Sequence, residues 1–154
     1  MKISETKMSV GLYLHGDDLN PDDISIILGV SPSGAHRKGD KRNPPVSPTT
    51  GREYIPYKSG LWSLVLHRDD AEVTDVITEL LTNLAKVELS LASLPGVQVA
   101  FFDVFIAGIM ERYKKSKHRD NKDTFEFELE HHQLAVLARF GIPIRFTATM
   151  CLNQ

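Results

Sequence analysis

The sequence predicts an α+β two-layer sandwich, in which helices pack on one face of a largely antiparallel, twisted sheet. Segments with an apolar residue at every second position alternate with segments whose apolar residues recur every three or four positions. Each helical segment has one apolar stripe and each strand has at least one apolar face, which suits two layers around one core. A length of 154 residues fits one domain, so we expect a single globular domain over residues 1–154.

The N-terminal third predicts a strand followed by a capped helix. Residues 8–14 alternate between apolar and smaller or polar side chains, which is the pattern of a strand with one buried face. Asn20 suits the N-cap of the next helix, Pro21 its first position and Gly29 its left-handed end. The apolar stripe of this helix is predicted at Ile24, Ile27 and Leu28. Residues 31–59, with five prolines, are expected to form a long irregular loop.

The middle of the chain predicts two strands separated by a long helix. The stretch LWSLVL, residues 61–66, is apolar on both faces, which favours an interior strand. Apolar side chains then recur at helical steps over residues 69–94, and Pro95-Gly96 stops this helix. Residues 97–108 are again apolar on both faces and predict a strand. A second irregular loop is expected at 109–124.

The C-terminal part predicts a strand, a short helix and a final strand. The stretch FEFEL, residues 125–129, alternates strictly, as do residues 144–150. Between them lies a helical stripe that Gly141 can end. The stripe is predicted at Leu134, Leu137, Ala138 and Phe140. The predicted order is therefore β-α-β-α-β-β-α-β, and the helix that starts near Asp69 is expected to be the main cover of the core.

The composition is that of a soluble globular protein. The formal net charge is −2, with 42% hydrophobic and 25% charged residues. The single cysteine, Cys151, has no internal disulfide partner, which favours a reducing compartment. The N-terminal segment lacks the apolar region of a secretory signal, and no apolar run has the length of a membrane-spanning helix. We therefore expect a cytoplasmic protein that does not enter membranes.

Positive charge is concentrated in the two irregular loops. Residues 34–58 and 111–123 each hold six of the 18 basic residues, whereas most acids lie elsewhere. The basic candidates for partner binding are Lys41, Arg42, Lys114, Lys115, Lys117 and Arg119. The acidic candidates are Asp17, Asp18, Asp69, Asp70, Glu72, Asp75 and Glu79. The alternative is that these charge runs are only solvated surface.

The segment from His36 to Asp40 has two interpretations. In the functional one, His36 and Asp40 act as base and orienting group, or Gly39 lets a phosphate approach the backbone. In the structural one, Gly39 supplies a positive φ angle, Asp40 accepts turn amides, and His36 packs locally. We favour the structural interpretation, because the sequence contains no recognisable nucleophile motif.

The remaining candidate side chains point to structure more than to chemistry. Trp62 is expected in the core. Asp103 interrupts an apolar strand, and it either faces a pocket or bonds to a neighbour. The histidines and Cys151 have no metal-ligand spacing, and no phosphate-binding or dinucleotide-binding motif is present. We therefore expect no metal and no cofactor.

Several of these segments together resemble an uncharacterised bacterial family, domain of unknown function 4279. The residues that carry the likeness are Pro32-Ser33, His36, Arg37, Lys38, Gly39 and Asp40, then Gly60, Leu61, Trp62 and Ser63, and the ending LAVLARFGIPIRF. The resemblance spans nearly the whole chain and implies one α+β domain without known catalytic residues. Residues 41–58 and 109–123 look divergent from the family pattern, so a shared site would be tuned there.

Three functions from different classes remain. The favoured one is a non-enzymatic protein-binding module, most concretely a bacterial immunity protein whose acidic clusters cover a basic toxin surface. The alternative is a small-ligand-binding protein or enzyme, in which His36, Arg37 and Lys38 converge on an anionic ligand together with Trp62 and Asp103. Nucleic-acid binding comes third, because the chain is acidic overall and has no aromatic-rich basic motif. Whether the protein is an enzyme, and its oligomeric state, stay open.

Overall fold

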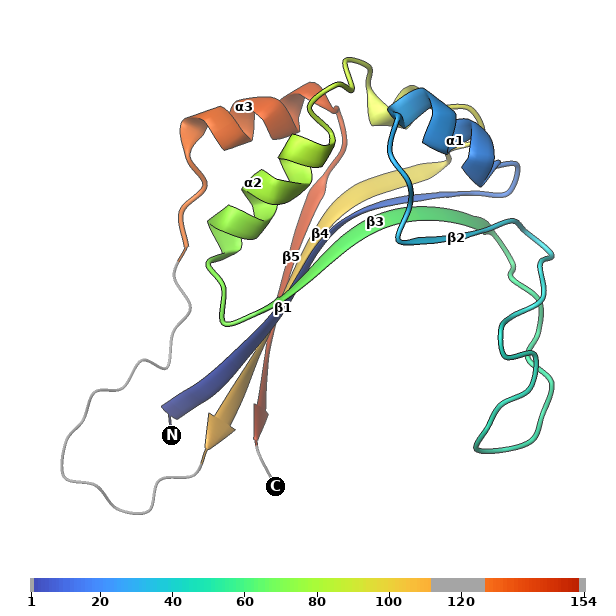
Figure 1. Cartoon of the computed structure of the whole chain (residues 1–154), viewed down its shortest axis with the longest axis horizontal. Helices are drawn as coiled ribbons and strands as arrows, with labels where there is room; N and C mark the ends of the chain where they lie inside the picture. Colours follow the sequence, from blue (N-terminus) through green and yellow to red (C-terminus); the bar gives the residue numbers. More distant parts are fainter. Residues whose placement is uncertain (1, 112–126, 153–154) are drawn as a thin grey trace.

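The computed structural model describes residues 2–111 and 127–152, and these form an α+β fold of two layers (Figure 1). The strands of its five-stranded sheet are β1 (Lys2–Gly16), β2 (Gly34–His36), β3 (Gly60–Asp69), β4 (Val99–Glu111) and β5 (Ile144–Leu152). The helices are α1 (Pro21–Leu28), α2 (Val73–Asn83), the 3-10 turn η1 (Leu91–Ser93) and α3 (His131–Arg139). The predicted fold class is thereby confirmed.

The sheet has the strand order β2-β3-β1-β4-β5, with β1 at its centre. β1 runs antiparallel to both of its neighbours, and β2 runs antiparallel to β3. β5 is the exception, because it pairs in parallel with β4 after the crossover through α3. β3 lies inside the sheet as predicted, but its second neighbour, β2, covers only its first few residues.

The element order differs from the prediction at two places. The loop predicted at 31–59 contains the short strand β2, which pairs with Leu61, Trp62 and Ser63 of β3. Conversely, residues 127–129 of the predicted strand FEFEL are not in a strand, and residues 125 and 126 lie outside the described part. The sheet therefore has the predicted number of strands, but β2 takes the place of the predicted strand FEFEL. β2 shows no alternation of its own, and it pairs with a strand that is distant in the sequence. In addition, β4 extends to Glu111, past the predicted start of the second loop.

The rest of the first loop, residues 37–59, is a hairpin-like excursion. Its two limbs are joined by backbone hydrogen bonds from Gly39 N–H to the Tyr57 carbonyl (2.8 Å) and from Tyr57 N–H to the Asp40 carbonyl (3.1 Å). Further out, Val46 and Glu53 form an isolated bridge. We name this segment the hairpin loop.

Helix α1 has the ends that the sequence predicts. The Asn20 side chain accepts a hydrogen bond from Asp22 N–H, Pro21 occupies the first turn, and Gly29 adopts φ 66°. The predicted stripe is wrong at one position, because Ile27 is 41% exposed, and the buried face is Pro21, Ile24 and Leu28. Positions 24 and 28 lie one turn apart on one face, whereas position 27 is rotated toward the edge of that face.

Helix α2 is shorter at both ends than predicted. Asp69 ends β3, and the Asp70 carboxylate accepts a hydrogen bond from Thr6 N–H (2.8 Å), so these acids lie at the end of the β1–β3 ladder instead of starting the helix. At the other end, Leu84 N–H bonds to the carbonyls of both Leu80 and Leu81, and three-residue turns replace the helix. The apolar side chains beyond this point are still buried, at Leu84, Val87, Leu91 and Leu94.

Helix α3 follows its predicted location, and its predicted stripe is right at Leu137 and Phe140 but wrong at Leu134 and Ala138, which are exposed. Leu137 is 7% exposed and Phe140 is fully buried, whereas Leu134 is 49% exposed. Gln133 takes the position toward the core, where its side chain amide donates to Thr78 Oγ1 (2.8 Å) on α2. Gly141 follows the helix at φ 66°, as its predicted role requires.

The core lies between the helices and one face of the sheet. That face consists of alternate residues in register on three strands: Met8, Val10, Leu12 and Leu14; Trp62 and Leu64; Phe102, Val104 and Ile106. All of them are buried, and Trp62 is fully so. The indole N–H of Trp62 donates to Ser25 Oγ on α1 (3.0 Å), which ties the helix layer to the sheet.

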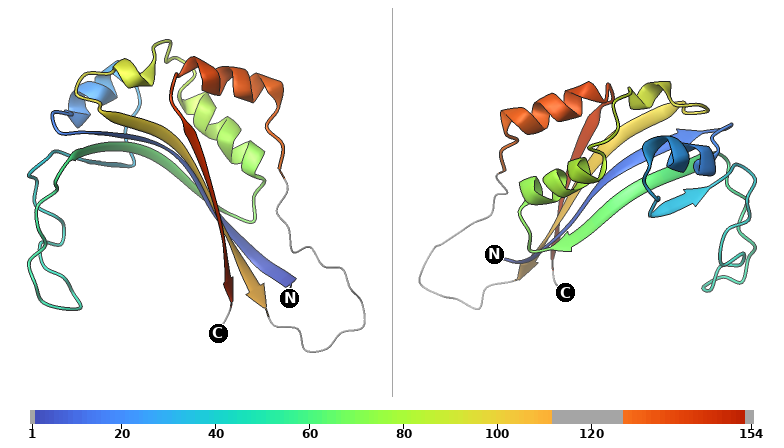
Figure 2. Two further views of the ribbon diagram at one scale, coloured as in Figure 1. Left: turned by 180° about the vertical axis from the view of Figure 1, so that it is seen from behind. Right: turned by 45° about the horizontal axis from the view of Figure 1, so that its top comes forward.

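The opposite face of the sheet is not covered by any helix of the described residues. Figures 1 and 2 show all three helices on the convex side of the bent sheet, and the hairpin loop hanging at one end of the concave side. We name the concave side the uncovered face. No helix in the described part of the chain is both long and apolar enough to span a membrane.

Candidate functional site

The uncovered face carries aromatic side chains on its two central strands. Tyr13 on β1 is paired with Phe101 on β4, and their rings stack with centroids 5.4 Å apart. The imidazole of His15, two residues further along β1, also stacks with the Phe101 ring, at 6.0 Å between centroids. All three side chains are only half-buried. Aromatic side chains are thus presented on a sheet face that is left open.

An arginine from the edge strand completes this cluster. Arg145 on β5 pairs in register with Asp103 on β4, but its guanidinium carbon lies 3.8 Å from the centre of the Phe101 ring. That distance is within the range of a cation–π contact. The side chain therefore lies along the sheet toward His15 and caps the aromatic cluster with a positive charge.

A second stack of the same type lies at the start of the hairpin loop. His36 on β2 stacks on Tyr57, with ring centres 3.4 Å apart. The guanidinium of Arg42 lies 5.0 Å from the centre of the Tyr57 ring, and its Nε donates to the Ile55 carbonyl (3.1 Å). Arg42 and Arg145 thus each lie over an aromatic ring, one beside β2 and the other on β5.

The register of the sheet joins the two stacks into one row. His36 pairs with Leu61 on β3, and Leu61 pairs with His15 on β1, so all three side chains point to the uncovered face. We name the row the cationic–aromatic band, which consists of Arg42, Tyr57, His36, His15, Phe101 and Arg145.

The band favours neutral imidazoles. Burial lowers the pKa of His15 below the ordinary value, and the positive charge of Arg145 lowers it further. Burial also lowers the pKa of His36, helped by the charges of His15 and Arg42, while a backbone hydrogen bond at Ser59 and the charge of Asp40 act in the opposite direction. Additional positive charge in this region is therefore unfavourable.

Asp103 faces the uncovered side next to the aromatic cluster. It lies in register with Gly11 on β1, two residues along the strands from the paired Tyr13 and Phe101. Burial raises the pKa of the Tyr13 phenol, and the negative charge of Asp103 raises it further. The two predicted alternatives for Asp103 were a pocket or a hydrogen bond to a neighbour; the described residues show it on the open face of the sheet, and neither alternative is observed there.

The turn from His36 to Asp40 makes structural contacts. Gly39 has φ 86°, and the Asp40 carboxylate accepts a hydrogen bond from Arg37 N–H (2.7 Å). Arg37 reaches α1, where it bonds to Asp22 at 2.7 Å, and Lys38 forms an ion pair with Asp17 that raises the pKa of the lysine. Arg37 and Lys38 are thus directed to the acids near α1 and do not join His36 on the band.

Trp62 and Asp103 do not meet the basic turn either. Trp62 is fully buried on the helix side of β3, whereas His36 belongs to the uncovered face. Asp103 pairs with Gly11, four residues along β1 from His15. The predicted convergence of His36, Arg37 and Lys38 with these two residues is therefore absent from the described side chains.

The acidic candidates fall into two groups at opposite ends of the sheet. Asp17 and Asp18 follow the end of β1 at Gly16, where β1 pairs with Gly60. The second group begins at Asp69, which pairs with Lys7 at the other end of the same ladder. This group continues along the loop and α2 with Asp70, Glu72, Asp75 and Glu79. The ends are roughly 30 Å apart at about 3.4 Å per strand residue. The two groups do not form one acidic surface.

Some of these charges are already neutralised. Asp17 pairs with Lys38, and Glu79 pairs with Arg68 on β3. Among the basic candidates, Lys41 and Arg42 lie in the hairpin loop and are exposed. The other basic candidates lie outside the described residues: Lys114, Lys115, Lys117 and Arg119.

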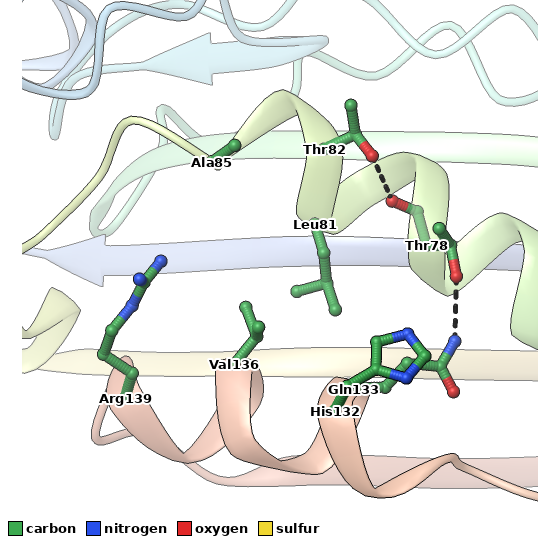
Figure 3. A pocket seen from close by; sticks show the side chains of 8 residues that line it. All are labelled: Thr78, Leu81, Thr82, Ala85, His132, Gln133, Val136 and Arg139. Carbon is green, nitrogen blue, oxygen red and sulfur yellow. Dashed lines mark hydrogen bonds between the residues drawn. The ribbon is translucent and has the colours of Figure 1, made fainter.

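A groove of about 350 Å³ lies on the other side of the molecule, between α2 and α3. Figure 3 shows its lining side chains, with Leu81 and Val136 facing each other across the helix seam. Its buried amide, Gln133, is fully engaged with Thr78, the Thr74 carbonyl and Glu130 N–H. The groove is therefore a helix–helix seam whose central polar group is satisfied. Within the residues that the structure describes, no cluster of His, Cys, Asp and Glu is able to hold a metal ion.

Sequence reasoning missed most of the cationic–aromatic band. Its members His15 and Phe101, and the neighbouring Tyr13, occupy alternate positions of strands that were predicted correctly, so the period of two identifies their common face. The period does not indicate which strands are neighbours, although the predicted packing of helices on one face already implies that the other face is open.

Comparisons with known proteins give one finding. A family model described as Domain of unknown function (DUF4279) matches residues 4–150. No curated protein and no solved structure matches the chain.

Proposed function

Since the chain belongs to the DUF4279 family, whose description names no activity, we propose its function from its own geometry. We propose a non-enzymatic protein-binding module, most concretely a bacterial immunity protein that binds and neutralises a toxin domain in the cytoplasm. The uncovered face of the sheet is the proposed binding surface.

The observation that carries the proposal is the composition of this face. Tyr and Arg are among the residues that dominate binding energy in protein interfaces, and they act at sites that a partner desolvates. Here Tyr13, Phe101 and Arg145 lie half-buried or exposed on the sheet, and Phe101 contacts both of the other two. Apolar neighbours add to the same face, including Val99, which is 48% exposed. A rigid, partly apolar surface of this kind loses little conformational entropy on binding.

Binding fits the described side chains better than catalysis does. His36 and His15, the two imidazoles of the band, contact aromatic rings and not a hydroxyl, thiol or carboxylate that would make a nucleophile–base pair. Arg37 and Lys38 are engaged with acids near α1, which weakens the alternative of an anionic small-molecule site built from the basic turn.

The proposal is tested with the gene next to the one that encodes this chain. We expect its product to contain a domain that stops growth when expressed alone, and co-expression of this chain to restore growth. The two purified proteins should form a complex in size-exclusion chromatography. No growth arrest, or growth arrest without rescue and without a complex, would contradict the immunity function.

A matched pair of variants tests the surface. Phe101→Glu places a charge in the aromatic cluster of the uncovered face, and we expect it to weaken the complex at least about 30-fold, the effect of losing an interface hot spot. Ile26→Glu makes the same kind of change on α1, where the side chain is 79% exposed on the helix layer, and should leave affinity unchanged. Circular dichroism of both variants checks that the fold is retained. Equal losses, or a loss only with Ile26→Glu, would place the interface elsewhere.

A further inference from the structure

We infer that the cationic–aromatic band binds an extended acidic segment of the protein partner, with carboxylates at the two stacked arginines. This inference rests on the proposed function and adds the chemistry of the partner. The two arginines, the span of the band and the surrounding charge each support it.

The two arginines are placed to receive carboxylates. Stacking on a ring engages the flat face of a guanidinium and leaves the N–H donors in its plane available to a planar anion. Arg145 lies in this way on Phe101. Arg42 lies over Tyr57 and uses only its Nε for the Ile55 carbonyl. Among the described side chains, no carboxylate lies within ion-pair distance of either guanidinium.

The span of the band fits a peptide in extended conformation. The band crosses the sheet from β2 to β5, with β3, β1 and β4 between them. Adjacent strands are about 4.8 Å apart, so the band extends over roughly 19 Å, the length of about six extended residues. A single carboxylate or phosphate would reach only one end of the band, whereas a short acidic segment reaches both.

The charge around the band is complementary to acidic side chains. The hairpin loop, residues 37–59, contains six basic and two acidic residues, although the chain is acidic overall. Arg145 adds a positive charge at the opposite end of the band. Two described carboxylates act on this region: Asp40 in the hairpin loop, which serves its own turn, and Asp103 on the uncovered face, which acts on Tyr13.

A protein segment fits the band better than a single-stranded nucleic acid does. Nucleic acids bind open sheets by stacking bases on free aromatic faces. In the band, Phe101 is covered by Arg145 and stacks with Tyr13, and His36 and Tyr57 stack on each other at 3.4 Å. The rings already serve as platforms for side chains of the protein itself.

Proton uptake is expected to accompany binding. The pKa of His36 is influenced by Asp40, Arg42 and His15, and the pKa of His15 by Arg145. The positive neighbours and burial keep both imidazoles neutral, and a bound carboxylate would offset these effects and favour the protonated forms. Acidic segments should therefore bind more tightly at about pH 6 than at about pH 7.5, between which imidazoles ordinarily titrate.

The experiment uses the full chain and three labelled probes in fluorescence anisotropy. These are an oligoglutamate peptide of about ten residues, an oligoglutamine peptide of equal length and an oligothymidine of similar length, all at low salt because charge contacts are screened. We expect oligoglutamate to bind at least about tenfold more tightly than oligoglutamine. Arg42→Gln and Arg145→Gln should each weaken oligoglutamate binding several-fold. Arg139→Gln, the same charge change on the helix side, should not.

The pH arm has its own variants. The gain in oligoglutamate affinity at lower pH should shrink in His15→Asn and His36→Asn, while Arg139→Gln keeps it. Equal binding of oligoglutamate and oligoglutamine, tighter binding of oligothymidine than of oligoglutamate, or equal losses in all three arginine variants would each overturn the inference.

The two proposals fail separately. If Phe101→Glu abolishes the toxin complex while Arg42→Gln and Arg145→Gln leave its affinity unchanged, the uncovered face binds the partner without an acidic segment, and only the inference is rejected. If oligoglutamate binds as expected while the neighbouring gene product forms no complex, the immunity function is rejected and the acidic recognition remains.

Discussion

Three glycines allow close backbone contact where the end of β1, the start of β3 and the turn before β4 meet; we call this point the crossing. A Cβ atom on Gly16 would lie 1.8 Å from the Gly96 carbonyl oxygen, and one on Gly60 would lie 2.7 Å from the Gly16 carbonyl oxygen. Gly96 also has φ 73°, and its Cβ would lie 2.6 Å from the Asp18 carbonyl oxygen. Only glycine allows these backbones to approach so closely. The crossing sets the position of α1 and of the sheet end that carries His15.

Gly96→Ala should therefore destabilise the protein more than a change of conformation alone explains. Gly29→Ala is the control, because Gly29 also has a positive φ, but a Cβ atom there would have no neighbouring atom within 4 Å. We expect Gly29→Ala to cost about 1–2 kcal/mol for the left-handed conformation, and Gly96→Ala to cost about 1–3 kcal/mol more for the overlap. Urea unfolding of both variants measures this difference, and equal costs would contradict the crossing.

Ser25 is predicted to stabilise the fold through its hydrogen bond with Trp62, beside the one that its hydroxyl donates to the Pro21 carbonyl within α1. Its hydroxyl accepts from the indole N–H of the fully buried Trp62. In Ser25→Ala the indole N–H would lose its partner inside the core, at a cost of about 1–3 kcal/mol in the free energy of unfolding. Denaturant unfolding of the variant checks this value. A Trp62→Phe background removes the donor, so the further effect of Ser25→Ala should be much smaller there; the same loss in both backgrounds would assign the effect to another contact.

The lowered pKa values of His15 and His36 predict how stability depends on pH. The unfolded chain takes up protons at a higher pH than the folded protein does, because both folded-state pKa values lie below the ordinary one. The contribution of these two imidazoles to the free energy of unfolding should thus be fully present above the ordinary imidazole pKa of about 6.5. It should be lost as the pH drops toward the folded-state pKa values. Denaturant unfolding across this range should show that the free energy of unfolding depends less steeply on pH in His36→Asn than in the unmodified protein. An unchanged slope would mean that its imidazole is not affected by folding.

At the scale of the elements, the sequence predicted correctly those helix ends that depend on neighbouring residues alone. Asn20, Pro21 and Gly29 specify both ends of α1 without reference to the rest of the fold. The length of α2 was overestimated because the buried apolar residues after Asn83 recur at the spacing of a helix, although the chain there forms turns. β2 and the parallel pairing of β5 were missed because both depend on distant partners in the sequence.

Helix α3 offers a direct comparison of two leucines. The apolar stripe includes both, yet Leu137 is 7% exposed and Leu134 is 49% exposed. Leu137→Ala should cost about 2–5 kcal/mol because it leaves a cavity beside the core, whereas Leu134→Ala should cost less than about 1 kcal/mol. Thermal or urea unfolding of the two variants measures the difference. Similar costs would mean that α3 packs with another face toward the sheet.

At the scale of the whole molecule, the sequence predicted a plain scaffold with charged loops, and the fold decides which charges meet. Arg37 and Lys38 look like one basic cluster with Lys41 and Arg42, but the first two pair with acids near α1, and Arg42 lies over Tyr57. The uncovered face follows from the placement of every described helix on the same side, as the predicted two-layer fold requires, whereas the residue pattern did not specify which strands are neighbours across that face. The candidate site is thus a product of topology more than of motif.

This arrangement predicts that the partner associates under electrostatic steering. The basic hairpin loop lies at one end of the uncovered face, so an acidic partner segment should be attracted before contact is made. Raising the salt from about 50 mM to about 500 mM should then lower the association rate constant at least about tenfold and change dissociation much less. Surface plasmon resonance with the toxin domain measures both rates.

The matched variant for this rate effect lies on the same loop. Lys41→Gln combined with Arg42→Gln removes two charges of the hairpin loop and should flatten the salt dependence of association, because the long-range field depends on the net charge of this end. Lys86→Gln, after α2 on the helix layer, should keep the dependence of the unmodified protein. If association is independent of salt, the contact is made by the apolar part of the face alone. The charge asymmetry of the fold would then have no part in partner recognition.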